Sequence, residues 1–116
     1  MPNDIDHLER FLLRALEMHM AGTLAGGLQQ GAKIHRREIS HVGWWTKHIH
    51  SDGTVKPNAK YFINFLAAEL GKHPELYWAA IHLQDHLIDE IEVSIYGADV
   101  LTSWDELQID GIVRDW

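Results

Sequence analysis

The sequence has no cysteine, only three prolines, and fewer basic residues (10) than acidic ones (17). Without cysteine, the chain cannot form a disulfide framework, a thiolate metal site or a cysteine nucleophile. No apolar run approaches the roughly 20 residues that span a bilayer, and the first residues carry acids rather than the basic cluster of a secretory signal. These absences predict a cytoplasmic protein that does not associate with membranes.

What is present is an ordinary globular composition, with 46% hydrophobic and 23% charged residues in a chain of 116. A chain of this length buries roughly two-thirds of its unfolded surface, enough for a cooperative core. We therefore expect residues 1–116 to form one domain. Within it, the glycines of 22–32 predict a flexible connection, and 110–116 is expected to form a mobile tail.

The net charge of −7 is distributed unevenly along the chain. Between Lys33 and Lys60 six bases accompany two acids, whereas between Asp85 and Trp116 nine acids accompany one base. Charge segregation of this kind influences the choice of partner and the rate of association more than it influences the fold.

Apolar periodicity predicts three helices. Residues 4–20 place apolar side chains at three- and four-residue steps on one face, behind Asn3 or Asp4 as the N-cap. Residues 58–70 continue from a capping Asn58 to a terminating Gly71, and a helix from Pro74 to about Ile91 follows.

The remaining segments are short. Residues 36–45 fit a brief helix, 46–56 a hairpin around Asp52-Gly53, and 103–107 a last helical turn with capping-box spacing. Alternation over 91–95 indicates a short strand or a helix end.

The predicted fold class is α+β, mostly α: three to four helices with a short β-hairpin. The expected core is Leu12, Leu16, Phe62, Phe65, Leu66, Leu70, Leu76, Leu83 and Leu87.

For function, the acidic C-terminal third favours non-enzymatic binding to a protein partner with a basic surface, because carboxylates pair with such a surface and tryptophan and tyrosine are frequent interface anchors. In general character the chain resembles phage-encoded inhibitors of nucleic-acid machinery. This hypothesis involves no catalytic residue and no cofactor. Its partner-binding residues are Tyr96, Asp99, Trp104, Asp105 and Glu106.

The first alternative is a small DNA- or RNA-binding regulator. A short helix, a hairpin and a following helix resemble a winged-helix layout, and Ala67 and Gly71 resemble the first helix and turn of helix-turn-helix regulators. Bases would contact phosphates, and a tryptophan would stack on a base. The residues concerned are Lys33, Arg36, Arg37, Trp44, Lys47, Lys56 and Lys60.

The second alternative is a metal site on a helix face. One helical turn separates His82 from His86, and Asp89 lies alongside, so the three could bind zinc or iron. The opposed charges of the middle and the end of the chain also allow a head-to-tail homo-oligomer.

Two adjacent tryptophans, Trp44 and Trp45, carry a further prediction. Neighbouring residues on a helix or a strand cannot both point into one core. One of the two is therefore expected to lie at the surface, at a rim or against a partner.

Overall fold

The computed structural model describes residues 5–20, 34–40, 43–48, 59–84, 87–95 and 103–115. These form one helix and six strands. The elements are α1 (Ile5–Met20), β1 (Ile34–Ser40), β2 (Gly43–His48), β3 (Ala59–Ala68), β4 (Glu75–Gln84), β5 (Leu87–Ile95) and β6 (Glu106–Arg114).

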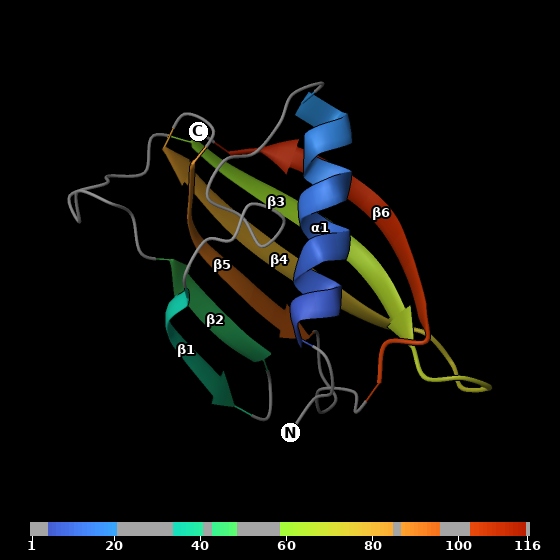
Figure 1. Ribbon diagram of the computed structural model, residues 1–116. Coiled ribbons are helices and arrows are strands. Elements are labelled where there is room, and N and C mark those ends of the chain that lie inside the picture. Colours follow the sequence, from blue (N-terminus) through green and yellow to red (C-terminus); the bar gives the residue numbers. More distant parts are fainter. Residues whose placement is uncertain are drawn as a thin grey trace.

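The strands form one antiparallel sheet in the order β1-β2-β5-β4-β3-β6. Helix α1 lies across one face of this sheet, in front of it in Figure 1. Strands β3, β4 and β5 follow one another as a meander, whereas the β2–β5 and β3–β6 ladders join segments far apart in the sequence. The described part of the chain thus has two layers, a helix and a sheet.

Helix α1 forms as its sequence predicts. Its core-facing residues recur at helical spacing, and Leu8, Leu12 and Leu16 are fully buried. Asp6 in the first turn and His19 in the last suit the two ends of the helix dipole. The predicted helix over 4–20 is confirmed.

The core lies between α1 and the sheet. Four aromatic rings form a chain through it: Trp44 contacts Trp104 at 5.6 Å between ring centroids, Trp104 contacts Tyr77 at 5.5 Å, and Tyr77 stacks on Phe65 at 5.4 Å. Aromatic pairs at these separations stabilise the fold by more than the burial of their apolar surface alone. The described part of the core includes seven residues from α1, from β2 and from the segment before β6: Ile5, Leu8, Leu12, Leu13, Leu16, Trp44 and Trp104.

The predicted fold class is wrong, because the described chain is mostly β. Residues 59–68 and 75–84, predicted as helices, are strands β3 and β4. Both faces of these strands carry apolar residues. Some apolar residues therefore lie three or four positions apart by chance, which is the spacing that predicts a helix. Tyr61, Ile63 and Phe65 are buried against α1, while Phe62 is half-buried on the other face.

Three smaller predictions are corrected as well. The helix expected over 36–45 is replaced by the β1–β2 hairpin. The helical turn expected over 103–107 is absent, because residues 103–105 are not helical and 106–107 belong to β6. Residues 110–114 of the expected tail also belong to β6, and the Asp115 N–H donates to the Lys60 carbonyl at 2.7 Å. Of the two alternatives for 91–95, a short strand or a helix end, the structure has the strand, as part of β5. Asp52-Gly53 and residues 22–32 lie outside the described residues.

A glycine is required where β2 meets β5. Gly43 has φ of +155°, and a Cβ there would lie 2.1 Å from the Val93 carbonyl oxygen. That oxygen is backbone and cannot move without disturbing the ladder. Any larger residue at this position would therefore push β2 away from β5.

The turn between β3 and β4 is held by a residue from the far end of the chain. The Lys72 N–H donates to the Glu69 carbonyl at 3.0 Å, and Gly71 at φ of +77° takes the left-handed position. The Leu70 N–H donates to the Asp105 carboxylate at 2.8 Å. Asp105 thereby joins the start of β6 to this turn.

Within the described residues, α1 is the one helix, and at 16 residues it is neither long nor apolar enough to cross a membrane.

Candidate functional site: the open face of the sheet

The two faces of the sheet have different surroundings. One packs against α1, and we call the opposite one the open face. On the open face the pairing register aligns one row of residues across all six strands. The row runs Glu38, Trp45, Glu92, Ala80, Phe62 and Val113.

Strand geometry divides the tryptophan pair between the faces. Successive side chains of a strand point to opposite sides, so Trp44 enters the core at 3% exposure while Trp45 is half-buried on the open face. The prediction that one of the two lies at the surface is confirmed.

The open face has an aromatic centre. Phe62 and Trp78 meet edge to face with ring centroids 6.3 Å apart, and the Lys60 ammonium lies 4.6 Å from the Phe62 centroid. Ala80 stands between large neighbours and is only 1% exposed. Trp45, Phe62 and Trp78 are each half-buried, so part of each ring remains accessible.

The charged members of the aromatic row are both carboxylates. Glu92 lies directly across from Trp45 on the neighbouring strand, and Glu38 lies across from Trp45 on the other side. Side chains facing each other in this way are about 5 Å apart at Cβ. A tryptophan ring between two carboxylates can accept a guanidinium group, which stacks on the ring and pairs with an acid.

The next row along the sheet carries charges of both signs. Its described side chains are Glu90, His82 and Lys60, on β5, β4 and β3. The row on the other side, which contains Ser94, Trp78 and Asn64, is uncharged. The aromatic centre is thus bordered by acids within its own row, by mixed charges along one margin and by neutral residues along the other.

The residues predicted to bind a protein partner are only partly brought together. Trp104 is buried in the core at 6% exposure, so we do not retain it as a contact residue; among the described residues its indole N–H has no acceptor. Asp105 and Glu106 are exposed, but the Asp105 carboxylate accepts from the Leu70 N–H and the Ser103 hydroxyl. These two bonds lower the pKa of Asp105. Tyr96 and Asp99 lie outside the described residues.

The basic residues of the nucleic-acid alternative are dispersed. Arg37 turns toward α1, Trp44 is buried, and Lys60 lies on the open face. Arg36 and Lys47 belong to the β1–β2 ladder. Lys33 and Lys56 lie outside the described residues. The winged-helix and helix-turn-helix layouts required helices at 36–45, 58–70 and 74–91, and the structure has strands there.

The metal alternative loses its helical geometry. His82 belongs to β4 and pairs in register with Glu90, while Asp89 is buried on β5. His86 lies outside the described residues. Among the residues that the structure does describe, no group of three or more histidine, aspartate or glutamate side chains could hold a metal ion.

Sequence reasoning missed the strongest polar cluster, which joins α1 to the β1–β2 hairpin. The fully buried Glu9 carboxylate accepts from Arg37 at 2.9 Å, from the Thr46 hydroxyl at 2.7 Å and from the Trp44 indole at 3.2 Å. Arg37 also donates to Thr46 and to Asp6, at 2.9 Å each. Burial raises the pKa of Glu9, and the hydrogen bonds and the Arg37 charge act in the opposite direction.

This cluster positions the helix rather than forming a binding site. Both Glu9 carboxylate oxygens accept hydrogen bonds from protein donors, as buried carboxylates require. One signal in the sequence pointed to it: Glu9 falls between Leu8 and Leu12, on the apolar face of an otherwise regular helix. An acid in that place needs a partner from elsewhere in the chain.

No protein-family model, curated protein or solved structure matches the chain.

Proposed function

We propose that the protein acts by non-enzymatic binding of a protein partner, which docks on the open face of the sheet. The observation that carries this proposal is the row of Trp45, Glu92, Ala80 and Phe62, in which two partly exposed aromatic side chains flank an acid and a buried alanine on a rigid sheet. Aromatic side chains on such a surface serve as anchors in protein interfaces.

The chemistry of the row favours a partner that presents arginine or lysine beside an apolar side chain. A cation over Trp45 would pair with Glu92 or Glu38, and an apolar group would contact Phe62 and Val113, the latter 59% exposed. A polyanion is less well matched, because both charged members of the aromatic row are negative.

The test compares captures from a lysate of the source organism by four immobilised forms of the protein. These are the wild type, Trp45→Thr, Glu92→Lys and the control Asp110→Lys, which makes the same charge reversal on exposed β6. We expect wild type and control to retain one stoichiometric protein that both open-face variants lose, before and after nuclease treatment. Circular dichroism checks that all four are folded.

Two outcomes would contradict the proposal. A partner retained equally by Glu92→Lys and Trp45→Thr would bind elsewhere on the protein. A partner set that disappears with nuclease would show that nucleic acid is the bound species.

A further inference from the structure

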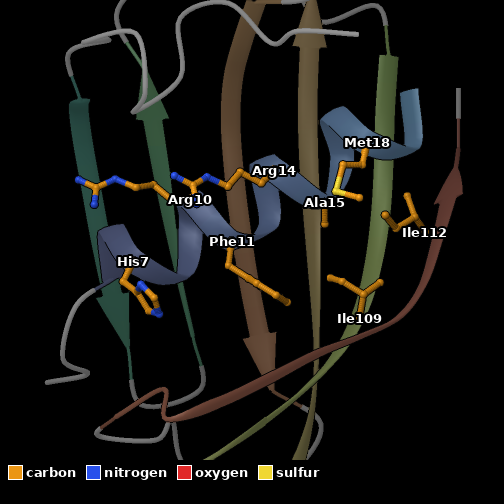
Figure 2. Close-up of a pocket in the computed structure, with 8 residues that line it drawn as sticks. All are labelled: His7, Arg10, Phe11, Arg14, Ala15, Met18, Ile109 and Ile112. Carbon is orange, nitrogen blue, oxygen red and sulfur yellow. The ribbon is translucent and has the colours of Figure 1, made fainter. Parts of the chain in front are cut away.

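A groove separates the outer side of α1 from strand β6. It has a volume of about 570 Å³, within the usual range for ligand sites, and its floor is mainly apolar. In Figure 2, Phe11 and Ile109 point toward one another across it, and Met18 and Ile112 do so at its other end. Met18 is 83% exposed, an unusual placement for a large apolar side chain beside other apolar groups.

Two arginines lie at the helix side of the groove. Arg10 and Arg14 line it one turn apart, together with His7, and in Figure 2 both arginine side chains extend from α1 away from Ile109 and Ile112. Neither arginine forms an ion pair with any residue that the structure describes. In a protein with a net charge of −7, two such arginines beside an apolar floor are complementary to an anionic amphipathic ligand.

The shape of the groove favours a helix over an added strand. From His7 to Met18 it follows three turns of α1, about 16 Å. Strand addition would need a regular free edge. The β3–β6 ladder shifts register between Asn64 and Phe65, so Asp110 forms a bulge in β6. The β6 edge also carries acids. Bulges and charges are the features by which edge strands resist pairing.

We infer that this groove binds an amphipathic helix of another protein that carries glutamate or aspartate along one side of its apolar stripe. Its apolar residues would lie on Phe11, Ala15 and Met18. Methionine adapts readily to such a helix, and acids one turn apart would pair with Arg10 and Arg14. This surface is separate from the open face, so the inference does not rest on the proposed function.

Two synthetic probes test the inference. Each is a fluorescein-labelled, hydrocarbon-stapled helix of about 18 residues with leucines at helical spacing; one carries glutamates beside the leucines and the other carries lysines at the same positions. Anisotropy at low salt should show the glutamate peptide binding at least roughly tenfold more tightly than the lysine peptide, a preference that weakens at about 0.5 M salt.

Charge reversal provides the decisive comparison. In the double variant Arg10→Glu/Arg14→Glu the preference should invert, so that the lysine peptide binds more tightly. Met18→Glu should weaken both peptides. Lys72→Glu, at a side chain 71% exposed in the β3–β4 turn, makes the same kind of reversal away from the groove and should leave both affinities unchanged.

Several results would overturn the inference. One is that the glutamate peptide does not bind the wild type at about 1 mM. Another is that it binds the double variant as tightly as the wild type. Laurate bound in the groove without any peptide binding would assign the site to a small amphiphile. A dimer in sedimentation that dissociates in the double variant would assign it to a second copy of this chain.

Discussion

Two sides of α1 meet the rest of the protein in different ways. The core side carries the buried Glu9, whose carboxylate accepts from three side chains on β1 and β2. The outer side leaves the groove that follows α1 beside β6 from His7 to Met18. A hydrogen-bonded cluster permits one position of the helix, whereas an apolar flank can accept a ligand without losing any internal bond.

The largest effect is expected from removing the cation of the buried cluster. Arg37→Met leaves the Glu9 carboxylate buried without its charged partner and should lower the free energy of unfolding by about 3 kcal/mol. Urea denaturation at neutral pH measures this. Lys72→Met, which removes an exposed cation, should change the stability by less than about 0.5 kcal/mol. Equal losses in the two variants would show that the cluster does not anchor the helix.

The Glu9→Gln variant tests the same buried cluster through the pH dependence of the free energy of unfolding. Because burial raises the folded-state pKa of Glu9 above its ordinary 4.5, the folded protein holds this proton more tightly than the unfolded chain does. Glu9 therefore makes the wild type lose stability as pH rises from 4.5 through the folded pKa, a loss that the glutamine variant lacks. The stability difference between wild type and variant should shrink as pH rises over this window. A difference that grows with pH would mean that the folded pKa is lowered instead.

Alanine substitutions should separate the core side of α1 from its groove side. Leu16→Ala, at a fully buried position, should cost roughly 2–5 kcal/mol, whereas Met18→Ala should stay within about 0.5 kcal/mol. Thermal and urea unfolding give both values. If Met18→Ala were as destabilising as Leu16→Ala, the outer side would be part of the core rather than a free surface.

The smallest effect concerns Asp105, an exposed carboxylate outside the helix that serves as a contrast to Glu9. Hydrogen bonds from the Leu70 N–H and from Ser103 lower its pKa below the ordinary 3.8. Its contribution to stability is therefore present above pH 3.8 and lost as pH falls through the folded pKa, opposite in sign to that of Glu9. Asp105→Asn should lower Tm slightly at neutral pH and match the wild type in strong acid. An equal Tm deficit at both pH values would contradict the assignment.

Local signals in the sequence predicted α1 but not the sheet. The helix has one apolar face, acids at its start and no glycine before residue 22, so its period is unambiguous. Strands β3 and β4 are apolar on both faces, and a pattern of that kind has no single period. The same property that concealed the strands produces the aromatic open face.

The candidate surfaces depended on long-range pairing that local patterns do not encode. Glu9 and Thr46 are 37 residues apart, and Glu9 and Arg37 are 28 apart. The alignment of Trp45 with Glu92 and Phe62 requires the order β2-β5-β4-β3, which no local motif specifies. Sequence did predict that one of the two adjacent tryptophans would lie at the surface, because that follows from strand or helix geometry alone.

The strand order also has a consequence for how the molecule folds. Strands β3, β4 and β5 are close together in the sequence and can pair early, whereas β2 must find β5 and β6 must find β3 across long stretches of chain. The central meander is therefore expected to form first and to receive the β1–β2 hairpin on one side and β6 on the other. Amide protons of β4, paired on both edges within that meander, should exchange with solvent last, and those of β1 and β6 first.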